Sequence, residues 1–380
     1  MILLKMYGLL FHVMVAILLK LSSLLIKDRV QVIPVLFMQN KRKTIIGLQA
    51  LIVVLLYCSC SDKDRKVETV IIKDFPAEYR LDGTLVSSMD SLPIMGQMFI
   101  TGRKLVVHQP RSKRPFRIYD LNNLNQNYEA GFIGHGANEF SFISSNYFAP
   151  QSDETFLLLD NYRLKHVSIR PDSSLETLST QTTFDLIPVN GFVKCGDLFI
   201  AYADCATGTE GDMEFRSLDK KNKREQRFSR YPEFHLGDIG QDERCQLYYK
   251  RCVCNERKNR MAAFYSYFPY FRLYDDYTKL SKEVYFGERL RASVISKKTS
   301  YYGNIYATEK YIYAFFKTDI QVWNWEAEPV ALLHFDRRVL TFAVDAEKGI
   351  LYALVSDKEF DCYRFYTYRL PVSDFVQDVR

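Results

Sequence analysis

The sequence predicts an all-β fold, a six-bladed β-propeller, on three observations. The 380-residue chain contains 26 Tyr and 27 Phe, and these residues favour pleated, half-buried surfaces. A two-strand pattern recurs six times after residue 61, with a mean step of about 49 residues, which is close to the period of propeller blades. No helical period of useful length competes there. A parallel α/β fold would need a helix of about 10–15 residues between strands, so it is excluded.

The six strand pairs can be placed in chain order. In each pair the first strand is a continuous apolar run and the second alternates, as expected where the middle strands of a blade are packed on both faces. The pairs are 104–108 with 115–120, 155–160 with 166–170, 197–202 with 213–218, 261–265 with 270–275, 311–316 with 320–325, and 350–355 with 363–368.

Another strand, Val67–Lys73, precedes the first pair. We predict that it closes the ring by completing the last blade beside the C-terminal strands; a locally packed edge strand is the alternative. The domains are therefore residues 1–60 as extension and signal segment, residues 61–66 as a short tether, and residues 67–380 as the propeller.

Composition and charge narrow the function. The chain has 47% hydrophobic and 25% charged residues, which excludes disorder and fibrous repeats. The formal charge is +6, but residues 1–60 contain seven basic side chains and one acidic one. The rest of the chain is neutral, whereas a surface that follows phosphates needs a basic excess. We expect no nucleic-acid partner.

Two apolar runs come before Ser61, namely residues 9–26 and 44–57. The second follows Lys41–Lys43, a basic cluster, and has the layout of a secretory signal. Its length of about 14 residues is short of the roughly 20 that a bilayer span needs. Met38 stands where such a signal would begin, so we predict that residues 1–37 are an over-extended gene start. A genuine first transmembrane helix is the alternative.

The end of this signal, Leu55-Leu56-Tyr57-Cys58-Ser59-Cys60, resembles a bacterial lipoprotein signal. In such signals the cysteine after a small residue is lipidated, which predicts lipidation at Cys60. Tyr57 and Cys58 depart from the usual pattern, and an ordinary signal peptide is the alternative. Polar and acidic residues after Cys60 resemble the export signals of Bacteroidetes surface lipoproteins. The resemblance implies a lipid anchor at the outer membrane or cell surface, or on the periplasmic side.

A second resemblance covers residues 67–380. The segment Phe132-Ile133-Gly134-His135-Gly136-Ala137-Asn138-Glu139-Phe140 resembles the Gly-x-Gly-Pro-Gly-Glu-Phe phrase of the six-bladed, TolB-like propeller lipoproteins of Bacteroidetes. Residues 321–330 and 342–345 resemble the last-blade phrases of that family. Ala137, Asn138 and Ala327 depart from it at turn positions. The resemblance implies an extracytoplasmic propeller and says little about chemistry.

No catalytic, cofactor-binding or metal-binding residue is predicted. The five histidines after residue 61 are widely separated, and we interpret His166 as a packed strand side chain. Cys252 and Cys254, with Cys245 upstream, lack the spacing of a zinc site. A bridge from Cys195 to Cys205 would have to span a whole strand, so the disulfide pairing stays open.

Other motifs are interpreted as structural. Ser217 and Lys220 match Ser-x-x-Lys, but the charged run Asp219–Arg227 is predicted to be a solvated loop. The glycines of residues 131–136 lack the dinucleotide-binding spacing and predict an inter-blade turn with positive φ. Asp204–Asp212 lacks the spacing of a calcium loop.

The segment Tyr248–Tyr277 is rich in tyrosine and phenylalanine interleaved with lysine and arginine. These rings could stack on sugars or on a partner, but we favour the interpretation that they fill the core between blades.

The predicted function is that of a binding or scaffold module for a protein, peptide or glycan, without a cofactor. The alternative is a glycan-active hydrolase or lyase, in which carboxylates about 5–10 Å apart converge in the channel.

Overall fold

The computed structural model describes residues 67–86, 96–151, 154–161, 163–182, 191–202, 213–219, 224–234, 246–287, 299–357 and 362–371. The chain divides into two compact units, residues 1–65 and 66–380. The first unit contains Met38, Cys58 and Cys60, which therefore lie outside the described residues. Within the described residues, no helix combines the length and the apolar character needed to cross a bilayer.

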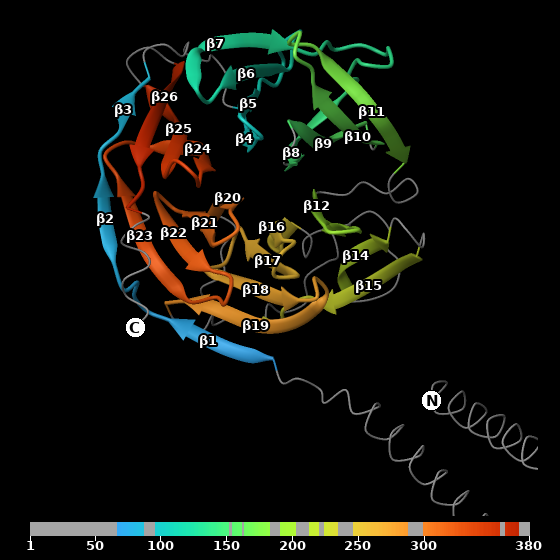
Figure 1. Cartoon of the computed structure of the whole chain (residues 1–380). Coiled ribbons are helices and arrows are strands. Elements are labelled where there is room, and N and C mark those ends of the chain that lie inside the picture. The colour runs from blue at the N-terminus through green and yellow to red at the C-terminus, as the bar shows by residue number, and fades with distance from the viewer. Residues whose placement is uncertain are drawn as a thin grey trace, which may run out of the picture. The chain divides into compact units, whose positions relative to one another are not determined.

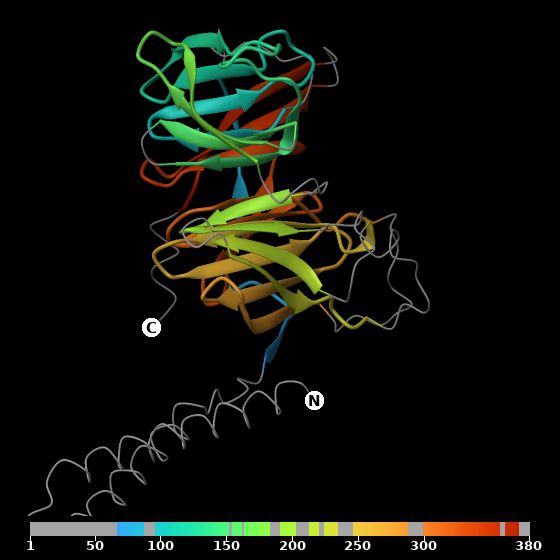
Figure 2. The same cartoon turned by 90° about the vertical axis from the view of Figure 1, so that its right-hand side faces the viewer.

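The described strands form six sheets arranged around a ring, which we number as blades I to VI (Figure 1). In each blade one edge strand is innermost in the ring. It contacts the innermost strands of the two neighbouring blades, and blades VI and I are in contact in the same way. The ring is thus closed, and the predicted all-β six-bladed propeller is confirmed. Figure 2 shows the same sheets from the side.

The strands of the first three blades are as follows. Blade I contains β4 (Met98–Thr101), β5 (Lys104–His108), β6 (Phe116–Asp120) and β7 (Asn123–Ala130). Blade II contains β8 (Ile143–Pro150), β9 (Thr155–Asp160), β10 (Arg163–Ile169) and β11 (Leu175–Thr182). Blade III contains β12 (Gly191–Cys195), β13 (Leu198–Tyr202), β14 (Met213–Asp219) and β15 (Arg224–Arg230).

The last three blades each include an N-terminal strand. Blade IV contains β16 (Lys250–Asn255), β17 (Arg260–Tyr265), β18 (Tyr270–Asp275), β19 (Lys279–Phe286) and β1 (Glu68–Ile72). Blade V contains β20 (Tyr302–Ala307), β21 (Tyr311–Phe316), β22 (Asp319–Asn324), β23 (Pro329–Phe335) and β2 (Glu78–Leu81). Blade VI contains β24 (Val339–Asp345), β25 (Ile350–Asp357), β26 (Cys362–Arg369) and β3 (Thr84–Leu85).

The six predicted strand pairs are the second and third strands of the six blades. In blade II, every side chain of β9 is buried, whereas β10 alternates between buried and less buried positions. A middle strand is covered on both faces by adjacent blades, so a continuous apolar run is what that position requires.

The predicted pairing of Val67–Lys73 with the last blade is wrong. Strand β1 pairs in parallel with β19, from Glu68 opposite Lys282 to Ile72 opposite Phe286, and so forms a fifth strand of blade IV. The strand alternates as its sequence pattern indicates, because Val70 and Ile72 pack against the core while Ile71 is 48% exposed. Alternation defines which face is buried, but it does not identify the neighbouring strand.

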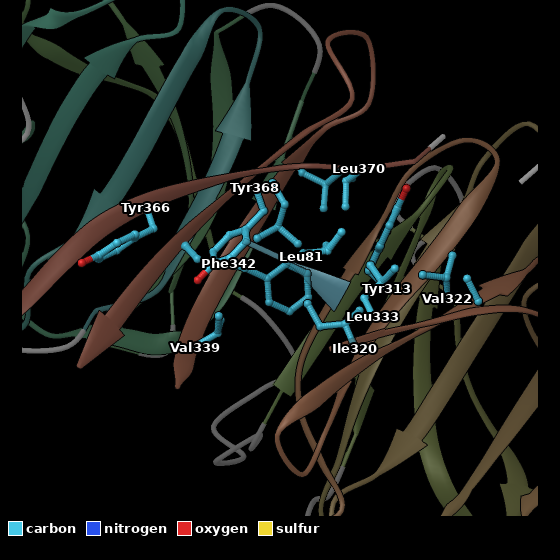
Figure 3. Close-up of a cluster of buried hydrophobic side chains, with 14 of the residues drawn as sticks. Leu81, Tyr313, Ile320, Val322, Leu333, Val339, Phe342, Tyr366, Tyr368 and Leu370 are labelled. Carbon is cyan, nitrogen blue, oxygen red and sulfur yellow. The ribbon is translucent and has the colours of Figure 1, made fainter. Parts of the chain in front are cut away.

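The N-terminal residues still close the ring, but further along the chain. Strand β2 pairs in parallel with β23, and β3 pairs antiparallel with β26 as the fourth strand of blade VI. Residues 68–85, which we name the N-terminal strap, therefore bind the outer edges of three consecutive blades (Figure 1). Leu81 of the strap is buried in the apolar cluster shared by blades V and VI (Figure 3).

The aromatic segment Tyr248–Tyr277 fills the core, as favoured from the sequence. Seven of its rings are buried, namely those of Tyr248, Phe264, Tyr265, Phe268, Tyr270, Phe271 and Tyr274. They pack in the apolar clusters of blades III to V, for example Phe264 on Phe271 with ring centroids 4.4 Å apart. Rings covered in this way offer no platform for a sugar.

Candidate functional site

The connections of blade I are long at one end of its strands and short at the other. In an antiparallel blade, successive connections lie at alternate ends. Residues 109–115 and 131–142 lie at one end, which we name the loop face, and the two-residue turns 102–103 and 121–122 lie at the opposite end. The loop face is where a propeller has room to bind a ligand.

These two long loops and the start of β8 enclose a pocket of about 400 Å³ between blades I and II. Ligand pockets usually measure about 300–1,000 Å³ and are mostly apolar with a few polar groups. The lining follows this pattern and is formed by His108, Gln109, Pro110, Arg111, Ser112, Lys113, Pro115, Ile133, Ser141, Phe142 and Ile143.

The loop 131–142 is held by its own backbone and by one carboxylate. Gly131 has φ +77°, so the predicted glycine turn with positive φ is confirmed at this residue. The Glu139 carboxylate accepts the Gly136 N–H at 2.7 Å, and Phe140 is fully buried in the core between blades I and II. Asn138, one of the departures from the resembled phrase, accepts the Thr177 N–H of β11 at 2.9 Å. The loop is thereby fixed to both blades.

Two pocket-lining residues each have a buried polar atom, closed to solvent, with no hydrogen-bond partner among the described residues. His108 is only 2% exposed, its ring lies against Phe116 and Phe148, and its Nδ1 is unpaired. The Oε1 of Gln109 is also buried and unpaired. Burial lowers the pKa of His108 to about 4, so its imidazole is neutral at pH 7. Buried polar atoms in native proteins are nearly always paired, with protein, water or ligand.

The charge of the pocket is positive. Arg111 and Lys113 are exposed at its rim, and no acid among the described residues pairs with either. Glu139 of the loop accepts the Gly136 N–H, and Asp160 accepts the backbone N–H groups of residues 141 and 142. Arg111 also has φ 74°, a left-handed backbone conformation that residues other than glycine seldom adopt. Strained residues of this kind concentrate at ligand-binding sites.

An apolar surface adjoins the pocket. Phe132, Ile133 and Phe142 are 51%, 50% and 69% exposed, and the Arg114 guanidinium lies 4.4 Å from the centre of the Phe132 ring. Three large apolar side chains exposed on one loop mark an interaction surface more often than a solvated turn. We name Phe132, Ile133 and Phe142 the apolar rim.

The channel strands do not provide the carboxylate pair that the alternative function requires. Across β4, β8, β12, β16, β20 and β24, one residue has a carboxylate, Asp345 at the end of β24. The strands that line the ring therefore lack the two acids of a glycosidase.

A second polar cluster lies at the seam between blades III and IV. The fully buried Glu214 of β14 accepts Lys250 Nζ at 2.5 Å, Arg272 Nη1 at 2.9 Å and the Tyr265 hydroxyl at 2.8 Å. Burial by itself would raise the pKa of Glu214, but Lys250 and Arg272 hold it below its usual value. Because these groups are paired with one another and enclosed, the cluster serves packing rather than binding.

The remaining predicted residues are dispersed. His166 lies partly buried on β10, and His135 is exposed in the loop 131–142. Cys195 of β12 and Cys254 of β16 form a disulfide with a Cα–Cα distance of 5.6 Å, while Cys252 and Cys362 are free. Within the described part of the chain, no group of three metal-binding side chains could hold an ion. Cys205, Cys245, Lys220 and Asp204–Asp212 lie outside the described residues.

The solvated loop predicted for Asp219–Arg227 is wrong where the structure describes it. Asp219 ends β14 and Arg224–Arg227 belong to β15. The side chains from Arg224 to Arg227 are nevertheless exposed, because β15 is the outer strand of its blade. Composition alone does not distinguish a charged segment on an outer strand from a charged loop.

No protein-family model matches the chain, and no curated protein matches it. Among solved structures, it is similar to a member of the DUF4221 family from Bacteroides vulgatus, with 12% identity, 78% of this chain and 97% of that chain covered, and a TM-score of 0.50. It is also similar to a luciferin-regenerating enzyme, with 10% identity, 76% of this chain and 95% of that chain covered, and a TM-score of 0.47. A calcium-binding protein, regucalcin, from Agrobacterium tumefaciens is similar with 9% identity, 77% of this chain and 97% of that chain covered, and a TM-score of 0.47. The first likeness supports the propeller fold and nothing finer.

Sequence reasoning missed the pocket residues. The signal that could have indicated them is the segment Gln109-Pro110-Arg111-Ser112-Lys113-Arg114-Pro115, which has three cations, no acid and two prolines between two strands of one blade. A loop that short does not need three cations for its turn.

Proposed function

We propose that the chain is a lipid-anchored extracytoplasmic binding module, and that it binds its ligand in the loop-face pocket between blades I and II. One observation supports this most strongly: a loop-face pocket of ligand size has two cations without an acidic partner at its rim and exposed apolar side chains beside it.

The pocket chemistry favours binding over catalysis. Its charged side chains are two cations, and no carboxylate that could orient the neutral His108 is among the lining residues. A base without a partner that orients it is poorly suited to acyl or glycosyl transfer. The residues present suit a ligand with a negative charge and an apolar part.

The finer parts of the proposal come from the sequence resemblances. We place the chain with the TolB-like propeller lipoproteins of Bacteroidetes, anchored through Cys60 at the outer membrane or cell surface, or on the periplasmic side. Its partner is a protein, peptide or glycan. Acyl chains at Cys60 would hold a neutral domain at the membrane.

The binding function is tested with the full chain in detergent on a combined glycan and peptide array. Ser141→Trp places an indole at the pocket and should abolish specific signals. Glu347→Trp, an exposed residue in the opposite-face turn before β25, is the matched control and should leave them unchanged. Signals that survive Ser141→Trp would place the binding site elsewhere.

The anchor is tested separately with labelled palmitate in cells. The wild-type chain should take up the label and Cys60→Ala should not. Equal labelling of both would reject Cys60, and loss of label in Cys58→Ala alone would move the anchor to Cys58.

A further inference from the structure

We infer that the loop-face pocket recognises the free carboxyl terminus of a peptide chain whose last residue is apolar. This inference rests on the binding function proposed above and names its ligand. It follows from the charge of the rim, the apolar lining, and the apolar surface beside the pocket.

The rim requires an anion. Arg111 and Lys113 stand at the pocket within three residues of each other and are unpaired by any acid of the described chain. A guanidinium donates two parallel N–H groups to a carboxylate, and an ammonium adds a point charge. A terminal carboxylate supplies the charge that both cations lack.

A peptide terminus has one carboxylate beside one side chain, so a single chain end can meet the two cations and the apolar lining together.

The rest of the lining requires an apolar group. Pro110, Pro115, Ile133, Phe142 and Ile143 line the space, which at about 400 Å³ has room for a terminal residue and the residue before it. An acidic sugar would satisfy the rim, but it would place several hydroxyl groups against these side chains, and unpaired hydroxyls are costly to bury. The lining therefore favours an aliphatic or aromatic last residue over a uronate.

The apolar rim favours a ligand that continues beyond the pocket. Phe132, Ile133 and Phe142 are half-exposed or more at the mouth, where a free amino acid would leave them uncovered. A chain leaving the pocket would lay its preceding residues across them. Extended peptides use their last carboxylate for orientation and alternate side chains for affinity in this manner.

The experiment measures fluorescence polarisation with the full chain in detergent. The probes are N-terminally labelled hexapeptides ending in Ala-Ser-Leu, one with a free carboxyl terminus and one amidated. We expect the free acid to bind at least tenfold more tightly than the amide, with a preference that weakens as salt increases. Equal affinity of acid and amide would overturn the inference.

Variants test the carboxylate site. Arg111→Ala with Lys113→Ala should remove the preference for the acid, whereas Arg103→Ala with Lys279→Ala, two exposed cations away from the pocket, should keep it. A preference that survives the loss of Arg111 and Lys113 would reject these residues as the carboxylate site.

An oligogalacturonate competitor distinguishes failure of the inference from failure of the proposed function. If it binds in a Ser141→Trp-sensitive way and the peptides do not, the pocket is a binding site but the ligand is an acidic glycan, and the inference is wrong. If neither probe binds and the array signals are indifferent to Ser141→Trp, the pocket is not the binding site and the proposed function fails with it.

Discussion

His108 illustrates how one residue can belong to the core and to a binding site together. It ends β5, a strand buried on both faces, and its ring packs between Phe116 and Phe148 as an apolar side chain would. Its Nδ1 nevertheless remains unpaired and closed to solvent. A leucine would pack there without this cost.

The buried imidazole should make the fold sensitive to acid. The pKa of His108 is about 4 in the folded chain, against about 6.5 for an unfolded histidine. Between pH 6.5 and 4 the unfolded chain therefore binds a proton that the folded chain does not, and stability falls as the pH falls. The expected loss from this residue is about 3 kcal/mol across that window.

Urea unfolding at pH 7 and pH 4 measures this effect. The difference in unfolding free energy between the two pH values should be smaller in His108→Gln than in the wild type. His135→Gln, an exposed histidine of the loop 131–142, is the control and should behave as the wild type. Parallel pH curves for wild type and His108→Gln would contradict the assigned burial effect.

At the scale of elements, the seam between blades III and IV is tied by three kinds of contact. The Cys195–Cys254 disulfide joins the innermost strands β12 and β16, and the Glu214 cluster joins β14 to β16, β17 and β18. Lys250 Nζ also lies about 5 Å from the ring centres of Phe215, Tyr231 and Tyr265. Covalent, ionic and cation–π contacts thus converge on one blade boundary.

Breaking the ionic tie should be costly. Lys250→Met leaves Glu214 and Glu283 with Arg272 as their only cation in the cluster, and removing one partner of a buried pair costs about 3–5 kcal/mol. Lys258→Met removes a partly exposed pair with Glu326, which is worth about 0–1 kcal/mol. Urea unfolding of the two variants at pH 7 measures the contrast, and similar midpoints would argue against a buried charge cluster.

Reducing the disulfide should weaken the same boundary. The bridge spans 59 residues of sequence, and closing a loop of that size in the unfolded chain is worth about 4 kcal/mol. Reductant should therefore lower the unfolding free energy of the wild type but leave Cys195→Ala with Cys254→Ala unaffected. Cys362→Ala, which changes a free thiol, should keep the reductant sensitivity of the wild type. An effect of reductant on the double variant would point to another bridge.

At the scale of the whole molecule, the N-terminal strap decides how the ring is held closed. Its three short strands add to blades IV, V and VI, and the last of them completes blade VI. Phe75, between β1 and β2, is buried with Trp323 and Phe286 at centroid distances of 5.0 and 5.5 Å. The strap is therefore fixed by side-chain packing as well as by backbone pairing.

A single substitution tests this fixing. Phe75→Ala should cost about 3–5 kcal/mol, because a buried aromatic side chain leaves a cavity between strap and blades. Ile71→Ala, on the exposed face of β1, should change stability by less than about 0.5 kcal/mol. Thermal unfolding of the full chain measures both. Equal, small effects would mean that the strap is a tether and contributes little to closure.

The sequence by itself determined the blades. The strand pairs at 104–120 through 350–368 were placed correctly because a strand covered on both faces must be apolar throughout, and that requirement is local. The positive-φ turn at Gly131 was predictable for the same reason, since a single residue type satisfies it. Ala327 shows the limit of such rules: it takes φ 63° in a turn where the resembled family has glycine.

Tertiary structure decided which strands meet and where a ligand can bind. The alternation of Val70 and Ile72 indicated a buried face of β1. It could not identify β19 rather than β26 as the partner strand, because pairing depends on where the chain runs around the ring. The disulfide partner of Cys195 and the pocket beside His108 likewise arise from blades that are adjacent in space. A pocket formed by two loops has no signature in either loop alone, because its depth and charge exist only when both are in place.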